Sequence, residues 1–311
     1  MVSRHSWSVF RPGPLCLLPI LPHWLNIAGV NEIHGVSSSF VVAVANSGRY
    51  RIYDGNSWSD EQQVNVDGSF ISNDLLGVWV EEEGKFWVSG GSRRLLYFDG
   101  DEWVDHTASV PAGSQDIHVW GFAANNVYAV GANGTVIRWN GSEWSTVSHG
   151  LTTATLNDIH GSAPDNIWIA ANGGRLLHYD GSDWTLYDDT ELDVGTTNLF
   201  AVWAASEDVI WAAGGDATIV WTVDGGLNWN STTLPGGHRI NDVFALSPTY
   251  AWFAKNGDAS AGQVWHYDGG SFFKISTTAT TGNNNMNGVF GPTPGHIWVV
   301  GANASVNHLL R

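Results

Sequence analysis

The stretch YDGSDW, residues Tyr179–Trp184, decides how this sequence is interpreted. Its acidic residue, Asp180, could be a catalytic carboxylate, a metal ligand or the residue that stabilises a hairpin turn. Variants of the stretch recur along the chain as YDGNSW, FDGDEW, WNGSEW, VDGGLNW and YDGGSF. The equivalent residues are Asp54, Asp99, Asn140, Asp180, Asp224 and Asp268.

The copy that carries Asn140 separates these interpretations. An Asn side chain accepts hydrogen bonds from turn amides as Asp does, but it cannot serve as a carboxylate base or a strong cation ligand. The following glycine supplies a positive φ without steric cost. The aromatic residue that closes each copy would bury roughly 150–250 Å² by packing between repeats. We therefore predict a structural turn for the whole set.

A second signature lies upstream of each copy, as in NDIHG at 157–161, where a β-branched residue precedes His, Trp or Phe. Successive members are 40 to 46 residues apart, and each unit holds four short β-rich runs without helical periodicity. Such a period with four strands per unit is typical of a β-propeller. The members are His34, Trp79, Trp120, His160, Trp203, Phe244 and Phe290. They predict an all-β fold, a seven-bladed propeller of four-stranded antiparallel blades.

The repeats predict a single domain over residues 1–311. Their approximate bounds are 31–65, 75–110, 116–150, 156–190, 199–235, 240–277 and 286–311. The last unit lacks a turn-and-tryptophan run, whereas HSWSVF at 5–10 resembles the outer segment of the third unit. We predict that 5–10 is the closing outer strand of the seventh blade, because closure removes exposed sheet edges. Residues 12–30, with four prolines, would form an irregular crossover.

Part of this N-terminal segment also resembles the apolar core of a signal peptide. LCLLPILPHWL at 15–25 follows two arginines, although its prolines and weak cleavage site favour an ordered extension of the fold. Both alternatives stay open. No uninterrupted apolar run reaches the roughly 18 residues of a membrane span, so no membrane insertion is expected.

Composition narrows the classes of partner. Basic residues number 13 against 30 acidic ones, giving a net charge of −17. Nucleic-acid binding needs clustered Lys and Arg and is therefore disfavoured. The single cysteine excludes an intrachain disulfide framework and a cysteine-based metal site. The 37 glycines and 18 tryptophans fit a turn-rich β protein.

The copy TVDGGLNW at 222–229 resembles the Asp-box, or BNR repeat, and the YDG..W copies resemble a shorter variant in bacterial propellers. This resemblance implies a sialidase-like propeller fold. Propellers of this kind include sialidases, other glycosidases, sortilin-like receptors, photosystem II assembly factors and lectins. Sialidases bind the substrate carboxylate with an arginine triad, which the ten arginines here do not supply at inner-strand ends. Sialidase catalysis is therefore not expected.

Another glycosidase would need two carboxylates roughly 5–10 Å apart. Glu32, Asp158 and Asp242 each lie two residues before the aromatic or histidine position. That repeat position favours turn or channel-rim polarity over catalysis.

The second signature supplies the candidate binding residues. Its aromatic side chains are expected mainly to pack between blades. The alternative is a platform on which sugars stack, with histidines as its hydrogen-bonding members. The candidates are His34, Trp79, Trp120, His160 and Trp203.

An acidic run offers a candidate metal site. Asp188, Asp189, Glu191 and Asp193 could bind Ca²⁺, although the run lacks the spacing of a known calcium loop and a solvated loop fits it better. We expect no other cofactor.

Together these observations favour a non-enzymatic platform that binds carbohydrate, extracellular or at the cell surface. An acidic, Trp-rich surface with Asn, Asp and Gly loops suits stacking and hydroxyl hydrogen bonding. The alternatives are a scaffold that binds partner proteins and a divergent glycoside hydrolase.

Overall fold

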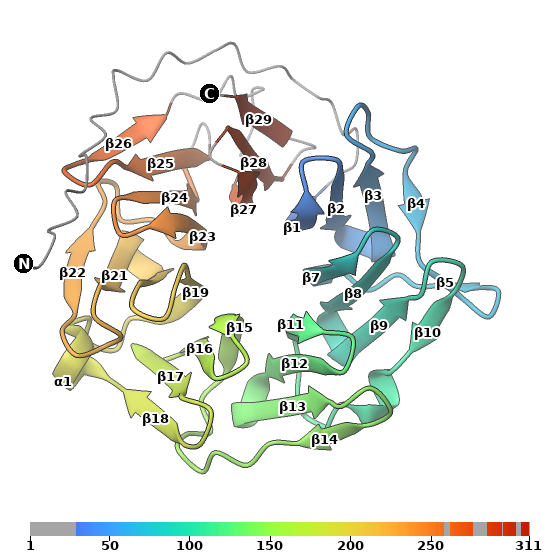
Figure 1. Cartoon of the computed structure of the whole chain (residues 1–311), viewed down its shortest axis with the longest axis horizontal. Coiled ribbons are helices and arrows are strands. Elements are labelled where there is room, and N and C mark those ends of the chain that lie inside the picture. The colour runs from blue at the N-terminus through green and yellow to red at the C-terminus, as the bar shows by residue number, and fades with distance from the viewer. Residues whose placement is uncertain (1–28, 258–261, 276–284, 294, 303–305, 311) are drawn as a thin grey trace, which may run out of the picture.

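The computed structural model describes residues 29–257, 262–275, 285–293, 295–302 and 306–310. Antiparallel sheets stand side by side around a central axis, each with its first strand innermost (Figure 1). The predicted all-β propeller of four-stranded antiparallel blades is confirmed in this architecture. In the described part of the chain, no helix is long and apolar enough to cross a membrane.

Six sheets have four strands and are numbered here as blades 1 to 6. Blade 1 contains β1 (Val30–Ser37), β2 (Phe40–Ala45), β3 (Arg49–Tyr53) and β4 (Gln62–Gln63). Blade 2 contains β7 (Leu75–Glu82), β8 (Lys85–Gly90), β9 (Arg94–Phe98) and β10 (Trp103–Asp105). Blade 3 contains β11 (His118–Ala123), β12 (Asn126–Gly131), β13 (Thr135–Trp139) and β14 (Trp144–Thr146).

Blades 4 to 6 follow the same order. Blade 4 contains β15 (Leu156–Ala163), β16 (Asn166–Ala171), β17 (Arg175–Tyr179) and β18 (Trp184–Tyr187). Blade 5 contains β19 (Leu199–Ala204), β20 (Ile210–Gly214), β21 (Thr218–Thr222) and β22 (Asn230–Thr233). Blade 6 contains β23 (Ile240–Ser247), β24 (Tyr250–Lys255), β25 (Gln263–Tyr267) and β26 (Phe272–Ile275).

The remaining sheet of the ring has three strands, β27 (Met286–Thr293), β28 (His296–Gly301) and β29 (Val306–Leu310). The prediction of seven four-stranded blades is therefore wrong in number for the described residues, in which six blades are complete. The fourth strand was expected from residues 5–10, which lie outside the described residues. The predicted crossover lies outside them as far as residue 28, as does the signal-peptide alternative.

The described residues nevertheless join the three-stranded sheet to blade 1. Asn287 Nδ2 of β27 donates a hydrogen bond to the carbonyl oxygen of Val30 in β1 at 2.8 Å. Farther out, the Trp58 ring packs edge-on against Trp298 of β28, with 5.4 Å between ring centroids. Figure 1 shows β27 and β1 as neighbours around the axis.

The core lies between blades, because each sheet is covered on both faces by its neighbours. The second strands are accordingly almost wholly apolar and buried. Large rings fill the gaps: Trp87, Trp168 and Trp211 are at most 1% exposed. The closing tryptophan of one blade packs on the second-strand tryptophan of the preceding blade, as Trp144 does on Trp87 at 5.2 Å.

The YDGSDW stretch forms the hairpin between β17 and β18. Asp180 Oδ1 accepts hydrogen bonds from the amides of Ser182 at 2.9 Å and Asp183 at 2.8 Å. These bonds lower the pKa of Asp180 to about 2. Asn140 Oδ1 accepts the same pair of bonds in blade 3, so the turn needs an acceptor rather than a charge.

The other copies of the turn are built alike. Asp54, Asp99 and Asp268 each accept bonds from the amides two and three residues ahead, and Asp224 accepts one from Asn228. Gly181 has φ +95°, and a Cβ there would lie 2.7 Å from the Asp165 side chain, which explains why this position is glycine.

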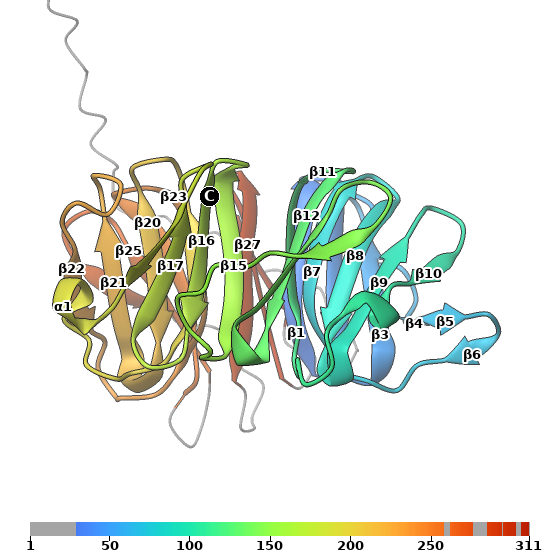
Figure 2. The ribbon, with the colours of Figure 1, turned by 90° about the horizontal axis from the view of Figure 1, so that it is seen from below.

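Connections between blades differ more than the blades do. A short helix, α1 (Asp189–Leu192), follows blade 4. A two-stranded ribbon, β5 (Asn65–Val66) and β6 (Ser69–Phe70), follows blade 1. Figure 2 shows this ribbon projecting from the rim of the ring, and we call residues 65–70 the rim arm.

Candidate functional site

The innermost strands present one equivalent position to the axis of the ring, two residues before the aromatic or histidine position. Glycine or alanine occupies it in two of the six blades and the three-stranded sheet carries Gly288, so the lumen depends on the remaining side chains. Those side chains are Glu32 in β1, His118 in β11, Asp158 in β15 and Asp242 in β23. All four line one cavity of about 50 Å³. A cavity of that size holds only a few water molecules.

Two of the three carboxylates in this cavity join neighbouring sheets. Asp158 accepts from its neighbour's amide, Ile159 N, and from Val202 N in blade 5, both at 2.8 Å. Asp242 likewise accepts from Val243 N at 2.7 Å and from Val289 N of β27 at 2.6 Å. These bonds satisfy backbone donors at the edges of inner strands, which face the lumen and not another strand.

Burial gives the cavity unusual protonation behaviour. It raises the pKa of Asp158 to about 7, despite the two amide bonds. Burial and repulsion from neighbouring carboxylates also raise the pKa values of Glu32 and Asp242 well above their ordinary values. Burial, helped by Arg239, lowers the pKa of His118 to about 4. The cavity therefore carries less negative charge at neutral pH than its composition suggests.

A glycosidase could not use these carboxylates in the cavity as it stands. Ligand pockets usually measure roughly 300–1,000 Å³, whereas this space is about 50 Å³. A sugar ring does not fit between Glu32, Asp158 and Asp242. Their bonds to backbone amides account for the acidic residues found at this repeat position.

Two residues farther along the innermost strands, six rings close the channel. We call these six side chains the aromatic plug. Neighbouring centroids in this ring are 3.7 to 5.7 Å apart, from the stacked pair His160–Trp203 to the edge-on pair Phe244–Phe290. The plug consists of His34, Trp120, His160, Trp203, Phe244 and Phe290. The channel is therefore two blind hollows separated by the plug.

The plug contains four of the five predicted binding residues. His34 Nδ1 accepts from Val80 N and His160 Nδ1 accepts from Ala204 N, each at 3.0 Å. Burial lowers the pKa of both rings, that of His34 to about 3, so both histidines act as neutral acceptors that join blades.

Trp79, the fifth predicted binding residue, does not lie in the plug. It packs between blades 2 and 3, where Gly121 leaves room for its ring. A Cβ at Gly121 would lie 2.7 Å from that ring. Trp79 occupies the same repeat position as the plug residues, but the space that the next blade leaves for the side chain differs from blade to blade.

The first hollow, which we call the funnel, opens where the innermost strands begin. Its volume is about 620 Å³, and amide side chains are the commonest kind in its wall. Asn157 Nδ2 donates to Leu199 O at 2.7 Å, and Asn241 Nδ2 donates to Met286 O at 2.6 Å. No hydrogen bond reaches the Oδ1 atom of either residue from the described residues. The wall thus offers acceptor oxygens to a ligand.

Arg239 and Phe200 add a second element to the funnel wall. The guanidinium carbon lies 3.6 Å from the centroid of the Phe200 ring, which holds the cation against the wall. Gln115 and Asp116 also line the funnel, and both are exposed to solvent, which places them at its mouth.

The second hollow lies at the opposite end of the channel and measures about 400 Å³. The plug forms its floor, and Val36, Leu246 and Pro292 line its wall. Its lining is mostly apolar.

The predicted calcium loop folds as a capped turn of helix. Asp188 Oδ1 accepts from Thr190 N at 2.9 Å, while Glu191 Oε2 accepts from Asp188 N at 3.1 Å. Asp189 accepts from Gly195 N, and Asp193 ends the helix in a left-handed conformation. Within the described ranges, no group of three His, Cys, Asp or Glu residues is arranged to hold a metal ion.

Sequence reasoning missed the rim arm and the groove beside it. The groove measures about 480 Å³ and lies between the arm and the outer hairpin of blade 2. The signal for the arm was present as the dipeptide Asp67-Gly68 between two short β-rich runs.

Comparison with known proteins supports the fold and no further assignment. No family model matches the chain, and no curated protein matches it. The Asp-box resemblance therefore stays a prediction. The structure described as "YCF48 bound to D1 peptide" superposes with a TM-score of 0.72 at 13% identity, covering 96% of each chain.

Two further solved structures are similar. YCF48 from Cyanidioschyzon merolae gives a TM-score of 0.68 at 15% identity, covering 94% of this chain and 98% of its own. The WD40 β-propeller domain of Doa1 gives 0.70 at 13% identity, covering 95% and 96%. At these identities the likeness establishes that the chain has a β-propeller fold.

Proposed function

We propose that this protein is a non-enzymatic platform that binds an extended segment of a partner protein in the funnel. The observation that carries the proposal is a blind hollow of about 620 Å³ with acceptor oxygens on its wall. That volume lies within the usual range for ligand sites. A similar propeller described as bound to a peptide supports the proposal by analogy of fold.

The chemistry of the wall suits a peptide backbone. The Oδ1 atoms of Asn157 and Asn241 can accept bonds from backbone amides, and the Phe200–Arg239 pair offers a flat apolar and cationic contact. Nδ2 of each asparagine is already engaged, so the orientation of both amides is fixed before a ligand arrives. Preorganised groups of this kind reduce the entropy lost on binding.

The test selects peptides on the wild-type protein and then measures their affinity for a variant whose funnel is blocked. A library of random twelve-residue peptides is panned on the wild-type protein, and enriched peptides are titrated by fluorescence anisotropy. Gln115→Trp places a bulky side chain at the mouth, where the Gln115 side chain is exposed to solvent. It should weaken binding at least about tenfold, which is about 1.4 kcal/mol.

Val36→Trp is the matched control, because Val36 lines the opposite hollow and is 45% exposed. It should leave the affinity unchanged. Failure of the library to enrich above an unrelated propeller would overturn the proposal, and so would loss of binding in Val36→Trp alone.

Carbohydrate binding is the second candidate. It is favoured by one observation, the floor of rings, including Trp120 and Trp203, in the opposite hollow. These rings contact one another, which leaves less of each face for a sugar. A glycan array with and without Ca²⁺ tests it, and Val36→Trp should then abolish any signal. An extracellular or cell-surface location stays a prediction.

A further inference from the structure

The rim arm distinguishes blade 1 from the other blades. Between blades 1 and 2 the chain forms β5 and β6, joined by a tight turn at Asp67 and Gly68, whose φ values are +50° and +84°. A two-stranded ribbon follows none of the other blades over the stretches that the structure describes. Because the repeats are otherwise alike, a feature added to one blade is a candidate for a role of its own.

The root of the arm is fixed to blade 1. Val64 and Ile71 flank the arm and are buried, and Ile71 N donates to Val64 O at 3.1 Å. Val64 N donates to Gly48 O at 2.9 Å, and Gln63 Nε2 donates to Ile71 O at 2.7 Å. The arm therefore leaves the ring in a defined direction.

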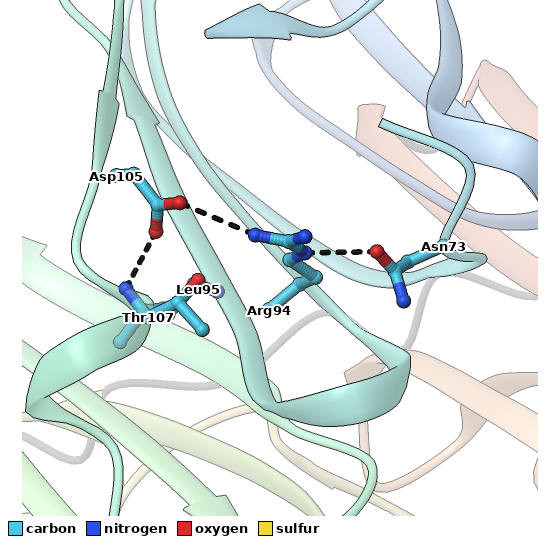
Figure 3. A network of polar contacts seen from close by, with 5 residues as sticks. All are labelled: Asn73, Arg94, Leu95, Asp105 and Thr107. Atoms are coloured by element: carbon cyan, nitrogen blue, oxygen red, sulfur yellow. Dashed lines mark hydrogen bonds and ion pairs between the residues drawn. The ribbon is translucent and has the colours of Figure 1, made fainter. Parts of the chain in front are cut away.

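A second set of contacts ties the end of the connection to blade 2 (Figure 3). Arg94 Nε in β9 donates to Asn73 Oδ1 at 2.8 Å, and Arg94 Nη1 pairs with Asp105 Oδ2 in β10 at 3.2 Å. Asp105 Oδ1 in turn accepts from Thr107 N at 2.7 Å. The end of the connection, at Asn73, is thus fixed to the outer strands of blade 2 before any partner binds.

We call the space between them the rim groove. Its floor contains Tyr50 and Trp103, whose rings meet edge-on at 5.4 Å and are 4% and 9% exposed. With so little of either ring face open, the floor does not suit the stacking of sugars. Asp67 lines the groove on the arm side, and Asp101 and Glu102 line it on the side of blade 2.

The charges around the groove have one sign. Neither Lys nor Arg is among the described residues lining it, and the whole chain carries a net charge of −17. Phe70, the last residue of β6, pairs with Asn65 at the root of the arm and is 66% exposed, so it offers an apolar contact there. An exposed aromatic beside a preorganised acidic groove fits a polypeptide with basic and apolar side chains.

We infer that the rim groove is a docking site for a segment of a partner protein rich in arginine or lysine. Arginine suits it best, because a guanidinium can pair with a carboxylate through two parallel hydrogen bonds. The site is separate from the funnel, so each can fail without the other.

The test measures binding of a fluorescein-labelled peptide with alternating Arg and Ser around one Leu, and of the same peptide with Glu for Arg. We expect the Arg peptide to bind and the Glu peptide not to bind. Glu102→Lys should weaken binding at least about tenfold, as expected when a close opposite charge is replaced by a like one. The side chain of Glu102 is exposed, and the turn uses only its backbone.

The matched control is Glu143→Lys, at the equivalent turn position of blade 3, where no arm follows. It changes the net charge by the same amount and should leave the affinity within about twofold of wild type. A second variant replaces Asn65–Phe70 by Gly-Gly and keeps Val64 and Ile71. It should retain cooperative unfolding but lose the peptide.

Equal weakening by Glu102→Lys and Glu143→Lys would overturn the inference, because general attraction to an acidic protein would then explain binding. Unchanged affinity in the arm replacement would overturn it too. Absence of binding by the Arg peptide in 50 mM salt would do the same, whereas the library selection on the funnel would be unaffected.

Discussion

The carboxyl group of Asp158 should make the protein less stable as pH rises from 5 to 8. Its pKa is about 7 in the folded protein, whereas an ordinary aspartate carboxyl, as in the unfolded chain, has a pKa of 3.8. A folded-state pKa above the unfolded value means that the folded state holds the proton more tightly. The stabilisation this gives is complete below pH 3.8 and is lost as pH rises through 7.

The magnitude follows from proton linkage. A group with these two pKa values lowers the free energy of unfolding by about 2.6 kcal/mol between pH 5 and 8. This is an upper bound, because the cavity has room for a few water molecules that can solvate the ionised carboxylate. We expect about 1–2 kcal/mol from Asp158 in practice. Glu32 and Asp242 should add to the fall, because their pKa values are also raised.

The assay is urea unfolding followed by tryptophan fluorescence at pH 5, 6, 7 and 8. Sodium chloride at 0.5 M screens the surface repulsion of a chain with net charge −17, but screens the buried cavity far less. Asp158→Asn should flatten the pH dependence. It should also cost about 1–3 kcal/mol at pH 5, because the new amide group faces the Val202 N–H, which then lacks an acceptor.

Asp183→Asn provides the control, since it removes one exposed carboxylate from the hairpin of the same blade. Its pH dependence should match that of the wild type. Equal slopes for wild type and Asp158→Asn would refute the reasoning and place the proton uptake elsewhere.

Further predictions concern stability and calcium. Trp168→Ala should lower the free energy of unfolding by about 3–5 kcal/mol in urea titrations, because the ring is fully buried; a loss below 1 kcal/mol would show that the blades repack. Asn287→Ala should cost about 1–2 kcal/mol by removing the bond to Val30 across the seam, and an unchanged midpoint would show that other contacts close the ring. Millimolar CaCl₂ should leave the melting temperature unchanged, because Asp188 and Glu191 cap α1; a rise that Asp188→Asn abolishes would contradict this.

The sequence predicted those parts of the fold that every repeat must solve in the same way. Asn140 beside Asp180 was enough to identify a turn, because a hairpin needs an acceptor whichever blade it closes. The aromatic spacing gave the four-stranded unit for the same reason. Neither pattern reports how many units are complete in the ring.

Features that depend on neighbouring blades could not be predicted in this way. Trp79 and Trp120 occupy one register position, yet Trp120 joins the plug whereas Trp79 turns into the space that Gly121 leaves. The rim arm was hidden for another reason. Its strands have two residues each, so the spacing of 45 residues between His34 and Trp79 indicated only a longer connection.

Polar side chains of the inner wall join neighbouring blades, and this affects which residues are good candidates for ligand recognition. A lone buried acid or histidine near a channel suggests a binding site, but Asp158, Asp242 and His160 each accept an amide from the next blade. These three side chains therefore join neighbouring sheets, and replacing any of them would leave a backbone N–H without its acceptor. Gln115 at the funnel and Glu102 beside the arm do not join blades through their side chains. They can therefore be replaced without loss of contacts between blades. Binding specificity should therefore depend on the funnel mouth and the rim.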